Sequence, residues 1–330
     1  MRLKLLAASL AACALIVQPA DARVVKTIVH GASLEGNLEG NSADRTVYVI
    51  LPPSYDANKS RRYPVLYFLH GFTATADKYM AYIPFDAALK ASGKDMIVVV
   101  PDSFTKFGGS MYSSSPTTGD FESFVARDLV GWVDAHYRTI AKRESRGLGG
   151  HSMGGYGTLR IGMKHPEVFS ALYAMNPCCL TPRPVETAEQ RFETMTPEQA
   201  AQGDFPTKGN FAVASAWSPD PKNPPFYSDL ATKDGKPVSF VLAQWAANAP
   251  QAMAAQYAPA QRRMSAIAMD AGTQDFVLNE GTGMHAALDK LGIAHGWTVY
   301  EGDHGNRVPE RFGTAVLPFF AAHLKPQERK

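Results

Sequence analysis

The chain has 330 residues, of which 45% are hydrophobic and 19% charged, a composition typical of a globular protein with ample material for a buried core. Its 33 basic and 31 acidic residues give a formal net charge of +2, and the basic residues are scattered along the chain. A nucleic-acid partner is therefore not expected, because it would require a basic patch or stripe.

Residues 1–22 have the layout of a secretory signal: a basic start, an apolar run over residues 5–17, and small residues before the expected cleavage site after Ala22. The apolar run is too short to span a bilayer. We therefore expect an exported protein, periplasmic or secreted. A lipoprotein box ending at Cys13 ranks below this, since the apolar run continues beyond it, and a buried N-terminal helix is the other alternative.

The rest of the chain, 23–330, alternates strand-like and helix-like segments. Apolar runs such as 63–69 are continuous, as in a sheet that is covered on both faces. The alternation predicts an α/β fold with a mostly parallel central sheet and helices on both faces, and antiparallel edge strands within 23–51. In chain order, strands are predicted at 46–51, 63–69, 95–101, 145–151, 169–175, 265–269 and 297–301, and helices at 121–137, 153–164, 281–291 and 309–324.

The alternation stops at about residues 178–263. This stretch contains many prolines, is too long for a simple turn and is too polar for a second core. We expect a single domain in which this stretch is a lid-like insertion over one end of the sheet. Trp217 begins a proline-rich run that ends at Phe226, and this run either forms one wall of an acyl pocket or is only a rigid loop.

Residues 150–154, Gly-His-Ser-Met-Gly, match the pattern G-x-S-x-G between a strand-like and a helix-like segment, which is the setting of a nucleophile elbow. The tight turn projects the serine hydroxyl into a cleft, and the flanking glycines avoid clashes. The amide of Met153 opens the following helix and is suited to bind a developing oxyanion. The pattern predicts Ser152 as a nucleophile, and the alternative is a glycine-rich helix start.

A second oxyanion donor is expected from the loop after the strand 63–69. There Gly71 allows the backbone to approach a substrate carbonyl, so the amide of Phe72 is the predicted donor. Taken alone, Gly71 fits a simple chain turn nearly as well. His70, Gly71 and His151 are expected to line the substrate site.

A serine nucleophile needs a base, and a triad on this kind of fold runs in the chain order serine, acid, histidine. Among the nine histidines, His304 follows the last predicted strand, as the base should. Asp270 and Asp275 both follow the preceding strand. Asp275 is preferred as the acid because it lies on the loop beyond that strand, where it can orient the imidazole.

Cys178 and Cys179 are adjacent, and neighbouring cysteines form only a strained ring. Two free thiols are the simpler expectation, and a vicinal disulfide near the active site is the alternative in an oxidising compartment. No metal site is expected, because the sequence has no C-x-x-C or H-E-x-x-H motif. No phosphate-binding or dinucleotide motif is present, so no cofactor is expected either.

The motifs together resemble the putative-esterase family of α/β-hydrolases, which includes S-formylglutathione hydrolases, feruloyl esterases, enterochelin-esterase-like proteins and mycolyltransferases. The serine motif and the spacing from Gly272 to Asp275 are the specific parts. The resemblance implies a triad of Ser152, Asp275 and His304. The segments that carry it are 63–71, 108–139, 149–169, 270–278 and 300–305.

The predicted function is hydrolysis of a small-molecule carboxylic ester through an acyl-enzyme on Ser152, with feruloyl, acetyl or similar acyl groups. Acyl transfer to a sugar or lipid acceptor would use the same intermediate, and product analysis with added acceptors would reveal it. A non-catalytic binding module is the third hypothesis, which labelling by a fluorophosphonate would exclude. The export signal argues against an S-formylglutathione hydrolase, because those enzymes are cytosolic.

Overall fold

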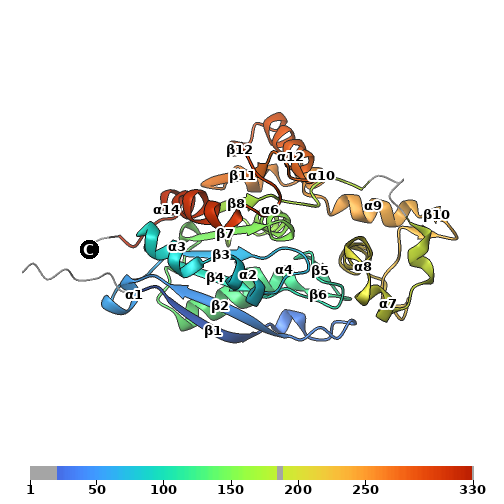
Figure 1. The fold of residues 1–330 in the computed structure, drawn as a ribbon, viewed down its shortest axis with the longest axis horizontal. Coiled ribbons are helices and arrows are strands. Elements are labelled where there is room, and N and C mark those ends of the chain that lie inside the picture. The colour runs from blue at the N-terminus through green and yellow to red at the C-terminus, as the bar shows by residue number, and fades with distance from the viewer. Residues whose placement is uncertain (1–20, 184–188, 329–330) are drawn as a thin grey trace, which may run out of the picture.

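The computed structural model describes residues 21–183 and 189–328, so the predicted signal segment lies outside the described residues except for Asp21 and Ala22. The central feature is an eight-stranded sheet with the order β1-β2-β4-β3-β7-β8-β11-β12 (Figure 1). β1 pairs antiparallel with β2, and β2 with β4, whereas the remaining pairs are parallel. The strands are β1 (Arg23–His30), β2 (Asp44–Leu51), β3 (Val65–Leu69), β4 (Ile97–Pro101), β7 (Arg146–His151), β8 (Ala171–Met175), β11 (Ala266–Gly272) and β12 (Gly296–Tyr300).

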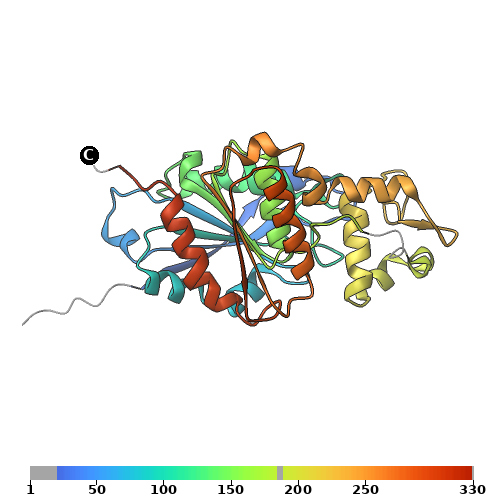
Figure 2. The same cartoon turned by 90° about the horizontal axis from the view of Figure 1, so that it is seen from above.

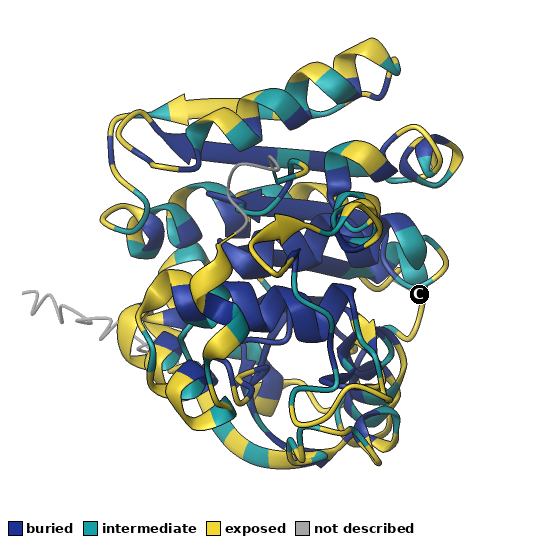
Figure 3. Ribbon diagram, turned by 90° about the vertical axis from the view of Figure 1, so that its right-hand side faces the viewer, coloured by how far each residue is buried: buried dark blue, intermediate teal, exposed yellow. Residues whose placement is uncertain are grey.

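Helices cover both faces of this sheet, and each face has its own layer of buried apolar side chains. One face carries the helical segment α4 (Phe121–Ser123), a π-helical stretch (Phe124–Leu129) and α5 (Val130–His136), together with α6 (Met153–Lys164) and α12 (Leu278–Lys290). The other face carries α2 (Ala76–Tyr82), α3 (Phe85–Ser92), α13 (Val308–Arg311), a π-helical stretch (Phe312–Val316) and α14 (Leu317–His323). Figure 3 shows the inner strands of the sheet as the buried centre between these layers, whereas the edge strands β1 and β12 are more exposed.

The predicted mostly parallel sheet, its antiparallel N-terminal edge and its two helical layers are therefore confirmed. The strand predicted at 265–269 extends further, to Gly272, because its parallel pairing with β12 continues to that residue. The helices α2 and α3 were not predicted. They are short, and α2 depends on a local cap in which the Thr75 hydroxyl accepts a hydrogen bond from the Lys78 amide.

The insertion between β8 and β11 forms one end of the molecule, away from the C-terminus (Figures 1 and 2). Its helices pack a small aromatic cluster against Phe107 of the body, and Trp217 and Trp245 extend the main core. It contains α7 (Pro197–Gln202), α8 (Phe205–Trp217), the hairpin β9 (Thr232–Lys233) and β10 (Lys236–Pro237), α9 (Ser239–Ala247), α10 (Pro250–Met253) and α11 (Ala258–Gln261). A short helix α1 (Ser54–Ala57) and the hairpin β5 (Ser114–Ser115) and β6 (Gly119–Asp120) complete the body.

None of the helices in 21–183 and 189–328 is long and apolar enough to cross a bilayer.

Candidate active site

Ser152 lies in a sharp turn between β7 and α6, with φ 58° and ψ −119°. A positive φ is unfavourable for a residue with a Cβ atom, so the surrounding packing must hold this turn in place. Only glycine fits at two positions of this turn. A Cβ atom on Gly154 would lie 2.0 Å from the carbonyl oxygen of Leu69. A Cβ atom on Gly150 would lie 2.5 Å from the backbone of Gly154. The glycines of the motif therefore serve the predicted steric purpose.

Ser152, His304 and Asp275 form a continuous hydrogen-bonded chain. The Nε2 atom of His304 lies 2.9 Å from Ser152 Oγ, and its Nδ1 atom lies 2.8 Å from Asp275 Oδ1. A carboxylate can only accept, so Nδ1 carries the proton and the lone pair of Nε2 faces the serine hydroxyl. This arrangement allows the imidazole to take the serine proton.

The Asp275 carboxylate is fully buried and receives two further hydrogen bonds, one from the amide of Val277 at 2.9 Å and one from the side chain of Asn176. Burial disfavours the charged form, but the hydrogen bonds to that form outweigh it and hold the pKa of this carboxyl below its usual value. Asn176 is in turn fixed by the hydroxyl of Tyr300, which donates to its Oδ1 at 2.6 Å. Asn176 was not predicted from the sequence, where its only signal is its place directly after a predicted strand.

The competing acid, Asp270, faces a different part of the protein. Its buried carboxylate accepts from Arg311 Nε at 2.7 Å and from the Tyr173 hydroxyl at 2.8 Å. These contacts connect the end of β11 to α13 and leave no route to the Ser152 hydroxyl.

The loop that follows β3 lies directly against Ser152. A Cβ atom on Gly71 would lie 3.3 Å from the Cβ of Ser152 and 2.7 Å from the Tyr79 hydroxyl, so only glycine fits there. Phe72, the next residue, lines the cavity at Ser152 together with Met153. Met153 is the first residue of α6, where backbone amides have no partner within the helix. Both predicted oxyanion residues are thus placed beside the serine.

Two residues expected to bind substrate do not line the cavities at Ser152. His70 is fully buried, and its Nδ1 donates to the carbonyl of Gly71 at 2.9 Å while its Nε2 accepts from the amide of Ser103 at 2.8 Å. These contacts fix the backbone of the loop at Gly71. Trp217 ends α8 facing the body of the protein, where its indole donates to Ser113 Oγ at 3.1 Å. For both side chains, the expectation of substrate contact was wrong because packing turns them inward.

His151 does border the site, in a way that the sequence did not reveal. Its Nε2 lies 2.7 Å from the backbone carbonyl of His304, and its Nδ1 lies 2.6 Å from the Tyr79 hydroxyl. A carbonyl only accepts, so Nε2 carries the proton and Nδ1 accepts from Tyr79. Burial, reinforced by the charge of nearby His304, lowers the pKa of His151 to about 3. His151 is therefore a neutral ring that fixes the loop of His304.

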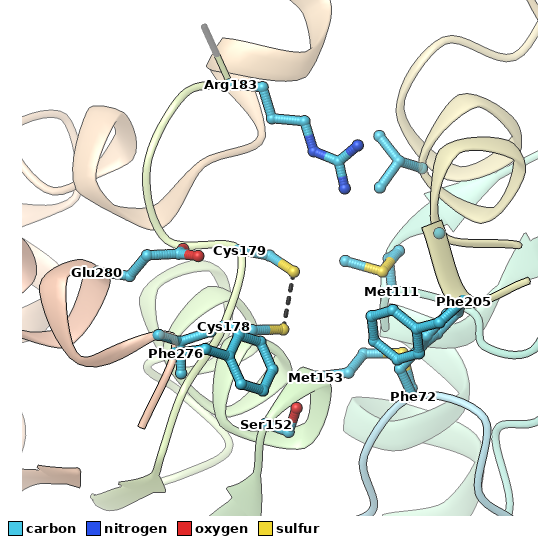
Figure 4. Close-up of a pocket in the computed structure, with 13 residues that line it drawn as sticks. Phe72, Met111, Ser152, Met153, Cys178, Cys179, Arg183, Phe205, Phe276 and Glu280 are labelled. Carbon is cyan, nitrogen blue, oxygen red and sulfur yellow. Dashed lines mark hydrogen bonds between the residues drawn. The ribbon is translucent and has the colours of Figure 1, made fainter. Parts of the chain in front are cut away.

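Two cavities meet at Ser152. The first has a volume of about 220 Å³, has largely apolar walls such as Met111, Phe72 and Phe205, and includes Arg183 (Figure 4). The second, of about 500 Å³, is lined by Gly71, Tyr79, His151 and His304. Phe205 and Phe276 border both cavities and are largely exposed.

Cys178 and Cys179 lie on the wall of the first cavity and carry free thiols, with their Sγ atoms 2.7 Å apart (Figure 4).

One group of side chains in the described part of the chain has the composition of a metal site. It consists of His285, Asp289 and His295, whose ligand atoms lie within 4.8 Å of one another. His295 directly precedes β12, whereas His304 follows the other end of that strand, so this group is separate from Ser152.

Comparisons with known proteins identify the family of this chain. The model of the family described as "Putative esterase" matches residues 41–308. An esterase of Mycobacterium tuberculosis is 32% identical over 130 residues, which are 38% of this chain and 27% of the relative. The S-formylglutathione hydrolase of Mus musculus is 27% identical over 150 residues, 40% of this chain and 51% of the relative. The matches thus span about a quarter to a half of these curated relatives.

Solved structures show the same fold. A ferulic acid esterase superposes with a TM-score of 0.66 at 22% identity, covering 93% of this chain and all of the other. An S-formylglutathione hydrolase from Staphylococcus aureus gives a TM-score of 0.63 at 13% identity, covering 92% and 100%. The sheet and its two helical layers are those of an α/β-hydrolase. The chain belongs to the family described as putative esterase.

Proposed function

We propose that the protein hydrolyses carboxylic esters through an acyl-enzyme on Ser152. The observation that supports this most is the chain of hydrogen bonds from Asp275 through His304 to the Ser152 hydroxyl. Serine is a weak nucleophile at neutral pH, and an imidazole at 2.9 Å with its lone pair toward the hydroxyl is the base that it needs.

In the first half of the reaction, Ser152 Oγ attacks the ester carbonyl while His304 Nε2 takes its proton. The amides of Phe72 and Met153 stabilise the negative charge on the carbonyl oxygen, and Asp275 stabilises the imidazolium. His304 then returns the proton to the departing alcohol. In the second half, water attacks the acyl-enzyme with His304 again as the base, which releases the acid and restores the serine.

The Ser152→Ala variant tests this proposal. It removes the nucleophile without enlarging a side chain, so we expect normal folding and a loss of roughly 10³-fold or more in kcat on 4-nitrophenyl butyrate. Labelling by a fluorophosphonate should disappear as well. Ser114→Ala, at an exposed serine of β5, is the matched control and should keep both. Full turnover or labelling in Ser152→Ala would contradict the proposal.

The acyl group is proposed to be small, such as feruloyl or acetyl. A feruloyl esterase of Xylanibacter ruminicola and an acetyl esterase of Caldicellulosiruptor saccharolyticus are among the relatives. The first cavity, about 220 Å³, supports this choice, because an apolar cavity of roughly 150 Å³ holds a benzene molecule. Initial rates on a panel of feruloyl, acetyl and long-chain esters would test it, and a preference for long chains would contradict it.

Export is proposed from residues 1–22 alone, because their layout is that of a secretory signal. The intact mass of the protein recovered outside the cytoplasm would test this, with Arg23 expected as the first residue. A mass that retained residues 1–22, or one that carried lipid at Cys13, would contradict cleavage after Ala22.

A further inference from the structure

Only one of the two cavities at Ser152 is lined by the base, His304. This difference indicates which cavity takes the alcohol and which takes the acyl group. His304 must hand its proton to the departing alcohol, so the alcohol has to lie beside it. His304 lines the second cavity and does not line the first. If the reaction proceeds as proposed, the alcohol lies in the second cavity and the first cavity takes the acyl group.

Arg183 stands at the far end of this acyl cavity. Figure 4 shows its guanidinium pointing into the cavity, with Ser152 at the opposite end and the side chains of Met111 and Phe205 between them. The cation lies 5.5 Å from the ring of Trp245, which supports it from the insertion. An acyl group attached to Ser152 and extending along the cavity would therefore end at a positive charge.

Glu280 is the other charged residue of this wall, and its carboxylate has other partners. It accepts hydrogen bonds from the backbone amides of Leu180 and Thr181. None of the ion pairs found among the described residues includes Arg183; the charge of Glu280 is close enough to interact with it, but the Glu280 carboxylate is directed at the two amides. A guanidinium has five N–H donors and stays charged at any physiological pH, so the planar acceptor that suits it best is a carboxylate.

We infer that, among small acyl groups, this enzyme prefers one with an apolar body and a terminal carboxylate, which pairs with Arg183, over the uncharged feruloyl and acetyl groups. The substrate class is thus the half-ester of a dicarboxylic acid, with about one aromatic ring or a short alkyl chain between its two carboxyl groups. The inference deepens the proposed ester hydrolysis and rests on it.

A matched set of 4-nitrophenyl esters tests the inference. Mono-4-nitrophenyl adipate and 4-nitrophenyl hexanoate share a six-carbon acyl chain and differ in the terminal carboxylate. We expect kcat/KM to be roughly 10-fold or more higher for the adipate, because charge-assisted hydrogen bonds are the stronger kind. Arg183→Met should abolish this preference by raising KM for the adipate, and leave the hexanoate within about 3-fold. Arg183→Lys should retain part of the preference.

Arg191→Met is the matched control, since it removes the same charge from an exposed position of the insertion that pairs with Glu189. It should keep the preference for the adipate. A third ester, between hexanoic acid and the hydroxyl of 4-hydroxybenzoate, places the carboxylate on the alcohol side and should show no dependence on Arg183.

Three results would overturn the inference. The first is an equal effect of Arg183→Met on the adipate and the hexanoate, which would make Arg183 only a wall of the cavity. The second is a preference for the 4-hydroxybenzoate ester that depends on Arg183, which would place the anion on the alcohol side. The third is that the unmodified protein hydrolyses none of the esters. Only this third result would reject the proposed function as well.

Discussion

At the scale of single residues, the site depends on side chains that hold the reacting groups in place. Asn176 holds the carboxylate of Asp275, and Tyr300 holds Asn176. His151 holds the backbone of His304, and Tyr79 holds His151. Each of these positioning residues restricts one member of the hydrogen-bonded chain, which matters because misplacement of a reacting group by about 1 Å can cost on the order of 10²-fold in rate.

Replacing Asn176 by alanine removes one hydrogen bond from the Asp275 carboxylate. We expect kcat to fall roughly 10-fold with little change in KM, since the imidazole would be less well oriented. The pKa of Asp275 should rise, because a hydrogen bond to its charged form is lost, and an NMR titration of this carboxyl would measure the rise. Asn58→Ala, on the exposed surface, is the control. An unchanged kcat and an unchanged pKa of Asp275 would show that Asn176 only fills space.

Because His151 is buried as a neutral ring, the stability of the folded protein should depend on pH. Its pKa is about 3 in the folded protein, against about 6.5 for an unperturbed histidine. Between these values the unfolded chain binds more protons, so stability falls as the pH falls from about 6.5 toward 3, by up to roughly 1.4 kcal/mol per pH unit. His151→Gln cannot titrate there, so its melting temperature should decline less steeply between pH 7 and pH 4. Parallel curves for the two proteins would contradict this assignment.

At the scale of elements, the turn from β7 to α6 depends on close contact between backbones. The strands β3 and β7 pair directly, and the carbonyl of Leu69 at the end of β3 faces Gly154 in the first turn of α6. This contact brings the glycine loop at Gly71 against Ser152, so the nucleophile and both proposed oxyanion amides come from adjacent strand ends.

Gly154→Ala should disrupt this contact. The added Cβ atom would lie 2.0 Å from the carbonyl oxygen of Leu69, and a rigid backbone cannot give way, so we expect a loss of about 3 kcal/mol or more of stability together with the activity. Gly131→Ala is the matched control, because it lies in α5 with open space around its Cβ position and should stabilise the protein slightly. Chemical denaturation of both variants measures the difference. A Gly154→Ala protein of normal stability would contradict the packing argument.

At the scale of the whole molecule, four neighbouring strands each supply one polar group at their carboxyl ends. In the order β7, β8, β11 and β12, these groups are Ser152, Asn176, Asp275 and His304. The insertion closes the same edge of the sheet and supplies one wall of the acyl cavity (Figure 2). The body thus provides the reacting groups, and the insertion provides part of the acyl cavity.

Phe205 tests whether the insertion contributes to substrate binding and not to the chemical step. It is 57% exposed, borders both cavities and packs edge-on against Phe72. Phe205→Ala should raise KM for a feruloyl ester roughly 10-fold while kcat and melting temperature stay nearly constant, since it removes apolar contact with substrate but little of the core. Phe240→Ala, at a 70% exposed phenylalanine of the same insertion, is the control. A large fall in kcat for Phe205→Ala would contradict a purely binding role.

The sequence by itself determined the mostly parallel sheet, the turn at Ser152 and the order of Ser152, Asp275 and His304, because local spacing and chain order are written in it. The tertiary structure alone decided which side chains surround these residues. It turned His70 and Trp217 inward, directed Asp270 to Arg311, brought Asn176 to Asp275 and aimed Arg183 at the acyl cavity. Such contacts join residues from distant strands and from the insertion, and only the packing of the whole chain sets their distances and directions.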